Sequence, residues 1–155
     1  MNRWLALILF IVAAFVVAAI GGSATASSVG DWYLGLNKPT WNPPSWVFGP
    51  AWTLLYLLMS IAAWRVWLRR DEPGAQTTLW LHAGQLVINA LWSIFFFGMQ
   101  RPDLALVDIL VLLGILIVIQ FRLFRFDRTA AYLWLPYVAW VTFATMLNKA
   151  IWLLN

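Results

Sequence analysis

The chain has 155 residues, of which 63% are hydrophobic, 17% aromatic and 10% charged. A soluble domain is usually about 45–50% apolar and about 25% charged, so this composition excludes an ordinary soluble enzyme and a disordered chain. Cysteine is absent, which excludes disulfides, thiolate chemistry and cysteine metal sites. The formal charge of +4 is too small and too dispersed to indicate a nucleic-acid partner.

Five apolar segments follow one another along the chain. They predict helices at about 4–26, 46–68, 79–99, 104–122 and 129–154, with one long loop at 27–45. Each is long enough to cross a hydrocarbon layer of about 30 Å. The sequence therefore predicts an all-α integral membrane protein, a bundle of five transmembrane helices that forms a single domain over residues 1–155.

The first segment has a second interpretation. Arg3, the apolar run Trp4–Ile20 and the small residues that follow resemble a secretory signal peptide. However, 17 apolar residues exceed the usual core of such a signal. Ala14, Ala18 and Gly22 also recur every four residues, a spacing that lets helices approach closely in lipid. We therefore expect the segment to be retained as the first helix.

Basic residues predict the orientation of the bundle. Five spans place the N-terminus and the second and fourth loops on one side, which carries seven arginines, against three basic residues on the other. This bias predicts a cytoplasmic N-terminus and an external 27–45 loop. Long apolar helices favour a bacterial inner membrane. An outer membrane stays open as the alternative.

The long loop is rich in tryptophan and proline. Pro43 and Pro44 interrupt any helix, and Ser45 is expected to cap the second helix. The tryptophans around them are typical of an aromatic belt at the membrane interface. Alternatively, their flat rings form a lid over a cavity.

The third helix has one polar and aromatic face. Its members step by three or four residues and so share a side of the helix: His82, Gln85, Asn89, Trp92 and Phe96. Polar groups are costly in lipid, so this face should point into the bundle, either as packing contacts or as a site. We expect His82 to lie at the interface. With one histidine and no acidic cluster, no metal site is predicted.

The fifth helix repeats this pattern with Tyr137, Trp140, Ala144 and Leu147. Large aromatic rings beside a small alanine leave either tight packing or a recess for a ligand. Pro136 is expected to kink or loosen this helix. No catalytic triad, phosphate-binding loop or pair of acids is present, so no catalytic residue is assigned from motifs.

Taken together, these stretches resemble the TspO/MBR family, the tryptophan-rich sensory proteins related to the mitochondrial translocator protein, or peripheral benzodiazepine receptor. The resemblance covers essentially the whole chain in the correct order and spacing. It is carried by Trp32-Tyr33, Lys38-Pro39, Trp41-Asn42-Pro43-Pro44, Trp46-Val47-Phe48, Pro50, Trp52-Thr53, Leu55-Tyr56, Gln85, Asn89, Leu91-Trp92, Phe96-Phe97-Gly98, Pro136-Tyr137, Ala139-Trp140, Ala144-Thr145, Leu147-Asn148 and Trp152.

The resemblance implies a five-helix bundle, commonly a homodimer, with a ligand cavity that opens toward the first loop. It also implies binding of tetrapyrroles such as protoporphyrin IX and heme, and of benzodiazepine-type ligands. These are ligands, and no cofactor is required. The residues implied to bind them are Tyr33, Trp41, Trp52, Asn89, Trp92, Trp140, Ala144 and Leu147. Lys38 would either meet a propionate or anchor the loop.

Two departures from the family pattern weaken further expectations. Lys149 and Leu153 replace the tyrosine and arginine of the family's sterol motif, so sterol binding by that route is doubtful. In the small-residue motif of the third helix, Ala83 is followed four residues later by Val87, so the motif that would support a homodimer is imperfect.

Three functions follow from these expectations. The first is a membrane protein that senses, sequesters or transports tetrapyrroles. The second is a light- and oxygen-dependent enzyme that degrades porphyrin, with Trp52 and Trp140 as candidate catalytic residues. The third is a conventional transporter, for which Asp108 is the one acid well inside a span. We also expect Asp108 to form an ion pair with Lys149 that locks the fourth helix against the fifth.

Overall fold

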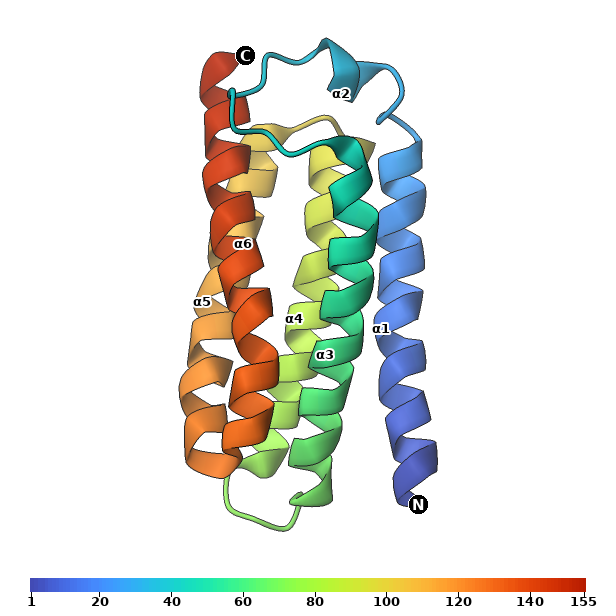
Figure 1. Ribbon diagram of the computed structural model, residues 1–155, viewed down its shortest axis with the longest axis vertical. Helices are drawn as coiled ribbons and strands as arrows, with labels where there is room; N and C mark the ends of the chain where they lie inside the picture. Colours follow the sequence, from blue (N-terminus) through green and yellow to red (C-terminus); the bar gives the residue numbers. More distant parts are fainter.

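The computed structural model describes residues 1–155, and five long helices run side by side along its long axis (Figure 1). They are α1 (Arg3–Ala26), α3 (Phe48–Leu68), α4 (Ala75–Ser93), α5 (Pro102–Phe126) and α6 (Arg128–Leu154). Three short elements lie between or beside them: α2 (Trp32–Gly35), the 3₁₀ turn η1 (Ser45–Val47) and the π-helical turn η2 (Ile94–Gly98). There are no strands, so the predicted all-α class is confirmed.

All five long helices have the length and composition of membrane spans. Counting η1 with α3 and η2 with α4, they contain 24 to 27 residues, and their most apolar windows have a mean hydropathy between 1.4 and 2.8. At 1.5 Å per residue, 24 residues extend about 36 Å, more than the hydrocarbon thickness of about 30 Å. The protein is therefore an integral membrane protein with five spans.

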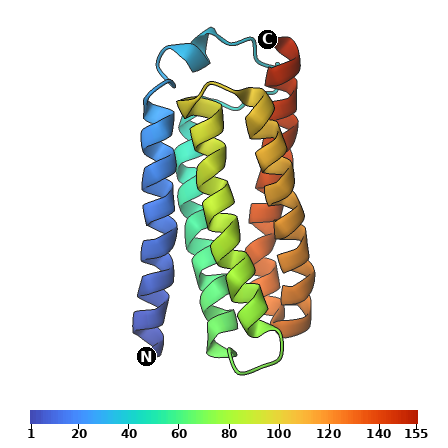
Figure 2. The ribbon, with the colours of Figure 1, turned by 180° about the vertical axis from the view of Figure 1, so that it is seen from behind.

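The helices pack so that α3, α4 and α6 surround the centre of the bundle. Helix α1 packs against α3 and α4, while α5 packs against α4 and α6 (Figure 2). Met59, Leu116, Trp134 and Tyr137 are among the largest fully buried side chains and form the core. The first apolar segment forms α1, a helix that packs on the bundle.

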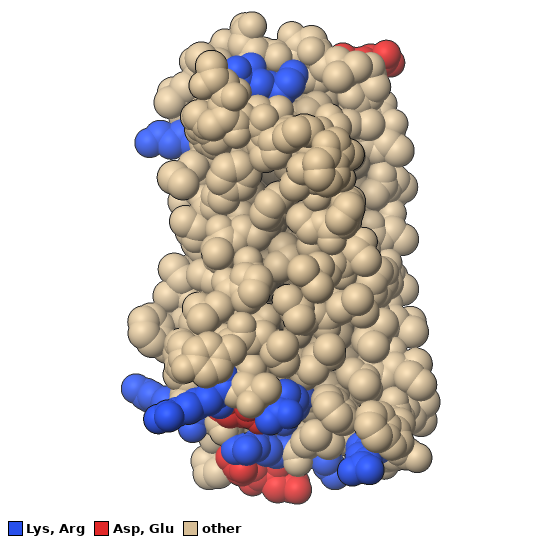
Figure 3. Space-filling model, in the orientation of Figure 1, with Lys and Arg blue, Asp and Glu red and all other residues tan.

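Charged side chains gather at the two ends of the molecule. Figure 3 shows a wide band without charge between a lower end with many basic side chains and an upper end with few. At the lower end, Asp127 caps α6 by accepting from the Ala130 N–H at 3.0 Å and pairs with Arg65 at 2.9 Å. The uncharged band is what a hydrocarbon layer requires.

Helix boundaries differ from the predicted ones at several ends. Ser45 does not cap α3, because the chain passes through the η1 turn first and no side chain caps the helix. Helix α4 begins at Ala75, four residues earlier than expected, after Gly74 at φ 86°. A positive φ suits glycine, and the Gly74 carbonyl accepts from Arg122 at 2.8 Å. Pro136 lies inside α6, which continues through it as one helix.

The predicted Asp108–Lys149 ion pair does not exist. Asp108 is 8% exposed, on the inner face of α5, and its Oδ2 has no hydrogen-bond partner. Lys149 is exposed and forms no salt bridge, because it lies on the opposite side of α6 from the residues that contact the bundle. Two side chains at a similar depth in the membrane cannot form an ion pair when they leave their helices in different directions.

Candidate functional site: a cavity beneath the first loop

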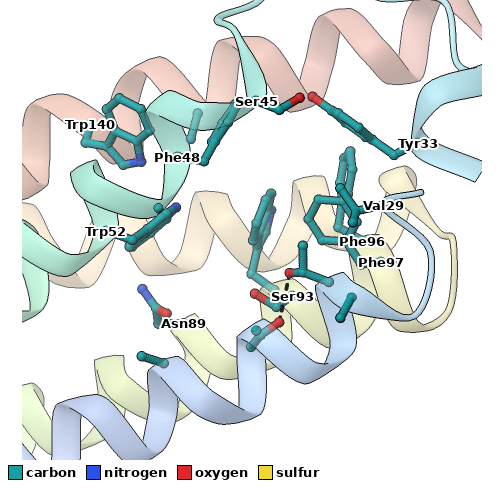
Figure 4. A pocket seen from close by; sticks show the side chains of 18 of the residues that line it. Val29, Tyr33, Ser45, Phe48, Trp52, Asn89, Ser93, Phe96, Phe97 and Trp140 are labelled. Atoms are coloured by element: carbon teal, nitrogen blue, oxygen red, sulfur yellow. Dashed lines mark hydrogen bonds between the residues drawn. The ribbon is translucent and has the colours of Figure 1, made fainter. Parts of the chain in front are cut away.

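A cavity of about 500 Å³ opens among α1, α3, α4 and α6 beneath the 27–45 loop. Its 24 lining residues come from these helices, the loop, η1 and η2, and 15 of them are hydrophobic. Figure 4 shows side chains from these elements facing a common space. Small-molecule sites typically measure about 300–1,000 Å³ and combine an apolar lining with a few polar groups. This cavity has both properties.

The π-helical turn η2 shapes one wall of the cavity. After α4 the chain widens at Ile94–Gly98, where the Met99 N–H donates to the Ile94 carbonyl at 2.7 Å. Such turns are rare and often occur at functional sites. Here the turn brings Phe96 and Phe97 to the cavity lining together, with ring centroids 4.9 Å apart.

Two tryptophans face the cavity with free hydrogen-bond donors. Trp52 of α3 and Trp140 of α6 both line it, and Phe48 packs edge-on against Trp140 at 5.9 Å (Figure 4). The indole N–H groups of Trp64, Trp92 and Trp134 donate within the protein, but those of Trp52 and Trp140 do not. Their rings therefore offer a ligand both a stacking surface and a donor.

Trp92 has a different role, because its N–H is already used. It donates to the Asn148 Oδ1 at 3.0 Å, and the Asn148 Nδ2 donates to the Pro102 carbonyl at 2.8 Å. Trp92 also stacks on Phe96 at 5.2 Å. These contacts hold the ring as a fixed wall between α4, α5 and α6.

The inner end of the cavity is polar. Tyr56 and Asn89 both line it, and the Tyr56 hydroxyl donates to the Asn89 Oδ1 at 2.7 Å. The Asn89 Nδ2 donates to the Tyr137 hydroxyl at 2.8 Å, and that hydroxyl donates to the Gln85 Oε1 at 2.7 Å. Gln85 and Asn89 are thus more than isolated packing contacts, because they belong to one connected network that ends at the cavity.

The first loop covers the outer end of the cavity. Tyr33 of α2 is 6% exposed, lines the cavity and donates to the Asn42 Oδ1 at 3.3 Å. Burial raises the pKa of the Tyr33 hydroxyl, against a smaller opposing effect of the Asn42 hydrogen bond. Tyr33 therefore stays protonated at neutral pH and serves as the donor to Asn42.

Lys38 anchors this loop. Its Nζ donates to the carbonyls of Tyr33 at 2.7 Å, Leu36 at 2.9 Å and Leu34 at 3.4 Å, and lies 4.8 Å from the centre of the Tyr33 ring. All three of its donors are directed at the backbone around α2. Of the two expected roles of Lys38, the structure favours the anchor.

A second contact ties the loop to the end of α6. The Asn37 N–H donates to the Asn155 Oδ1 at 3.0 Å, and the Asn155 Nδ2 donates back to the Asn37 carbonyl at 2.9 Å. The Asn37 Nδ2 adds a bond to the Leu154 carbonyl at 3.3 Å. We call this set of contacts the Asn37–Asn155 clasp. It fixes the loop over the cavity.

Seven of the eight predicted ligand-binding residues line the cavity: Tyr33, Trp52, Asn89, Trp92, Trp140, Ala144 and Leu147. Trp41 does not. Its side chain is 47% exposed and packs edge-on against Phe143 of α6 at 5.7 Å, outside the lining. The expectation that Trp41 lines the cavity is corrected. Its ring covers the outer face of α6.

His82 is not at the interface as expected. It is 5% exposed and packed between the rings of Phe10 and Trp134, at 6.0 and 5.9 Å. The helical pattern placed it on the correct face, but not at the correct depth, because α4 begins a turn before the apolar run. No group of three or more histidine, cysteine or acidic side chains is placed to hold a metal.

Comparison with known proteins identifies the family. The sequence profile of the TspO/MBR family matches residues 10–153. The chain belongs to the TspO/MBR family. It is 41% identical over 153 residues to the tryptophan-rich protein TspO of Archaeoglobus fulgidus, with 97% of each chain covered. It is also 43% identical over 135 residues to the tryptophan-rich sensory protein of Cereibacter sphaeroides, covering 85% of this chain and 84% of the relative.

A eukaryotic relative of the same family is also similar. The human translocator protein is 40% identical over 123 residues, which cover 78% of this chain and 73% of the relative. The match includes bacterial, archaeal and mammalian members of the TspO/MBR family, as the sequence motifs predicted.

Several lining residues of this TspO/MBR protein were missed by sequence reasoning. Phe15, Ala18 and Gly22 of α1 line the cavity, although the small residues among them were expected to pack helices. Ala14 does pack helices, since it is fully buried in the core, and a further close contact is at Gly21, which also lines the cavity and where an added Cβ would lie 3.0 Å from the Ser93 Oγ. Tyr56 stood in the family motif without an assigned role. No periodic signal in α1 separates a cavity wall from a lipid-facing surface, because both are apolar.

Proposed function

We propose that this protein binds a tetrapyrrole, such as protoporphyrin IX or heme, in the cavity beneath the first loop, and that it senses, sequesters or transports that ligand. The observation that carries the proposal is the cavity of about 500 Å³ with the free indole donors of Trp52 and Trp140 on its wall. Benzodiazepine-type ligands, which are also flat and largely apolar, would use the same space.

The chemistry of the lining supports a large, flat, amphipathic ligand. Aromatic rings on several sides can stack on a macrocycle at centroid separations of about 4.5–7 Å. Asn89 and Tyr56 offer polar contacts at the inner end, and Tyr33 offers one under the loop. Two relatives, named a sensory protein and a translocator protein, support sensing or transport.

We further propose that the N-terminus faces the cytoplasm of a bacterial cell and that the cavity opens toward the external side. The end that holds the N-terminus carries seven of the eight arginines and is the lower, basic end in Figure 3, which favours its cytoplasmic placement. Tagging each loop with a reporter that is active on one side of the membrane tests this orientation.

The ligand proposal is tested by titrating protoporphyrin IX into the purified protein in lipid nanodiscs and following tryptophan fluorescence and the porphyrin absorption band. We expect saturable binding of one porphyrin per chain. Ala144→Phe places a ring in the cavity and should abolish binding. Ala139→Phe, on the exposed side of the same helix, should not. Equal binding by both variants, or none by the wild type, would reject the proposal.

A second candidate function is degradation of the porphyrin in the presence of light and dioxygen. It is favoured by the position of Trp52 and Trp140, whose rings both reach the cavity and can give an electron to a photoexcited macrocycle bound there. Illumination of the porphyrin complex in air and under argon distinguishes this function from binding alone. Loss of porphyrin only in air, and only with both tryptophans present, would support it.

A further inference from the structure

Five polar side chains form a hydrogen-bonded chain from the cavity into the centre of the bundle. In order from the cavity they are Tyr56, Asn89, Tyr137, Gln85 and His82. All five are less than 9% exposed, and only Tyr56 and Asn89 line the cavity. Because buried polar groups must be satisfied by one another, the orientation of each member constrains the next.

The donors in this chain all point the same way. Tyr56 donates to Asn89, Asn89 to Tyr137, and Tyr137 to the Gln85 Oε1. The remaining Gln85 group, Nε2, is a donor and lies 3.4 Å from the His82 Nδ1 and 3.7 Å from the Met59 Sδ. An amide nitrogen cannot accept, so the His82 Nδ1 is unprotonated and the ring carries its proton on Nε2.

The His82 Nε2 makes no hydrogen bond within the protein. The His82 ring lines a second, small cavity of about 10 Å³ together with Thr78 and apolar residues of α3, α4, α5 and α6. That volume is about one water-sized sphere. Water both donates and accepts, so a single molecule there would satisfy Nε2 with or without its proton.

No charged side chain lines this second cavity. Phe10 of α1 and Trp134 of α6 face the imidazole edge-on, and the residues of α3 and α5 are aliphatic. Arg122 of α5 approaches only as far as the Thr78 hydroxyl, to which its Nε donates at 2.9 Å. With no carboxylate to balance an imidazolium, the two accessible states of His82 are its neutral tautomers.

Each member of the chain can take the opposite orientation. The tyrosine hydroxyls rotate, the two amides turn over, and His82 moves its proton from Nε2 to Nδ1. In the reversed chain, the His82 Nδ1 donates to Gln85, Gln85 to Tyr137, Tyr137 to Asn89, and Asn89 to Tyr56. Proton number and charge are unchanged, because the two tautomers differ only in which ring nitrogen holds the single proton: Nε2 gives its proton to water and Nδ1 takes one from water during local opening of the helices.

We propose that these five side chains form a reversible hydrogen-bond relay, in which the tautomer of His82 decides whether Tyr56 accepts from a ligand or donates to it. In the observed direction the Tyr56 hydroxyl donates its hydrogen bond to Asn89, so only its oxygen lone pair, an acceptor, is left for a ligand in the cavity. In the reversed direction it offers a donor. A ligand that presents a carbonyl or carboxylate at the inner end of the cavity therefore stabilises the Nδ1–H tautomer of His82, about four side chains away.

The relay assigns roles to residues outside the cavity. Gln85, Tyr137 and His82 act as positioning residues, because they reach a ligand only through Asn89 and Tyr56. The Met59 sulfur accepts from the Gln85 amide in the observed direction only, which biases the ligand-free protein toward it. The predicted response to a ligand rests on the proposed binding function. The direction of the hydrogen bonds in the ligand-free protein does not.

His82 is the one histidine of the chain, so ¹⁵N-histidine labelling gives a single-site probe. A protonated and an unprotonated ring nitrogen have widely separated ¹⁵N resonances, which report the tautomer directly. In the ligand-free protein in nanodiscs we expect mainly the Nε2–H tautomer. Gln85→Met removes the donor to Nδ1 and should shift the ratio toward Nδ1–H. Gln120→Met, a buried glutamine of α5 outside the relay, should not.

Either of two ligand-free results overturns the proposal: a wild-type protein with mainly the Nδ1–H tautomer, or a ratio unchanged in Gln85→Met. If Gln85→Met does not fold, Tyr137→Phe asks the same question, because it removes the hydroxyl that holds the Gln85 Oε1. Tyr132→Phe, on the exposed side of α6, is its matched control.

The second half of the experiment adds protoporphyrin IX, whose propionates are acceptors. Saturation should move the wild-type His82 signal toward Nδ1–H, and Tyr137→Phe should bind the porphyrin without that change. Binding with no change in the wild type, or an equal change in Tyr137→Phe, overturns the relay. If no porphyrin binds at all, the proposed function fails, while the ligand-free tautomer still decides the direction of the relay.

Discussion

The indole rings of Trp52 and Trp140 meet edge to face across the gap between α3 and α6, with centroids 6.5 Å apart and planes at 84°. Both rings line the cavity. Neither indole N–H donates within the protein. In contrast, the indole N–H of Trp92 in α4 donates to Asn148, which fixes that ring. Ligand contacts should depend most on the unfixed pair.

Replacing Trp140 by phenylalanine should keep the fold and weaken porphyrin binding. Phenylalanine preserves most of the apolar area but removes the indole N–H, and one hydrogen bond is worth about 0.5–1.5 kcal/mol, or about two- to tenfold in Kd. Porphyrin titration in nanodiscs measures the change. Trp80→Phe, a change at a side chain that is 70% exposed on α4, is the matched control. If photodegradation occurs, it should also slow in Trp140→Phe, and a wild-type rate would exclude a role of this residue.

Truncating Trp52 and truncating Trp41 should have different consequences, although both belong to the tryptophan-rich motif. Trp52→Ala removes a wall of the cavity and should reduce porphyrin affinity by at least tenfold. Trp41→Ala removes a ring that lies outside the lining and should reduce affinity much less. The two titrations are compared directly, and a larger loss in Trp41→Ala would show that the bound state draws the loop tryptophan inward.

The helices and the inner face of α4 could be predicted because one effect, the free-energy cost of placing polar groups in lipid, decides both. Polar groups are excluded from lipid, so the spacing of Gln85 and Asn89 among apolar residues was enough to orient the helix. The same argument failed for α1, where Phe15 of the cavity wall and Val16 of the exposed face are equally apolar. Periodicity cannot distinguish a surface that faces lipid from one that faces a cavity.

Residues whose positions depend on the loop or on neighbouring helices were predicted less well. Trp41 lies outside the cavity because the Lys38 anchor and the clasp hold the loop. Their hydrogen bonds join side chains to backbone groups, and no sequence pattern predicts which backbone groups are bound. His82 is deeper than expected because α4 starts at Ala75. The prediction of an Asp108–Lys149 ion pair was wrong because the sequence indicates the depth of a residue along its helix but not the rotation of α5 relative to α6.

Lys149→Ala should leave stability almost unchanged. Its side chain is exposed and forms no salt bridge, and such surface substitutions usually stay within about 0.5 kcal/mol. Thermal unfolding in detergent, followed by tryptophan fluorescence, measures the effect. A clear loss of stability would restore the ion pair with Asp108 that the structure contradicts.

Asn155→Ala should open the loop more often and speed ligand release. The change removes both side-chain bonds of the clasp, to the Asn37 N–H and to the Asn37 carbonyl. Since exposed hydrogen bonds contribute about 0.5–1.5 kcal/mol each, we expect the dissociation rate of protoporphyrin IX to rise by about two- to tenfold per bond lost. Stopped-flow displacement gives this rate. Asn2→Ala, which removes the cap at the other end of the molecule, should leave it unchanged.

Asp127 should make stability depend on pH at the arginine-rich end. Burial would raise the pKa of this carboxyl, but the Ala130 N–H, Arg65 and the more distant Arg69 together hold it below its ordinary value of 3.8. A carboxyl with a lowered pKa in the folded state binds protons more readily when unfolded. Its contribution is therefore complete above the unfolded pKa of about 3.9 and is lost as pH falls through the folded pKa.

Comparison of the wild type with Asp127→Asn isolates this contribution, because asparagine can still cap α6 but carries no charge for the arginines. At neutral pH the variant should be less stable by about 1.5–3 kcal/mol, the usual contribution of hydrogen bonds to a charged group. The difference in thermal midpoint should then shrink as pH falls below about 4, because the wild-type carboxyl becomes neutral as well. Asp71→Asn, at an exposed aspartate without a salt bridge, should track the wild type throughout. A difference that persists undiminished at the lowest pH where the protein stays folded would show that Asp127 stabilises through its shape and cap alone.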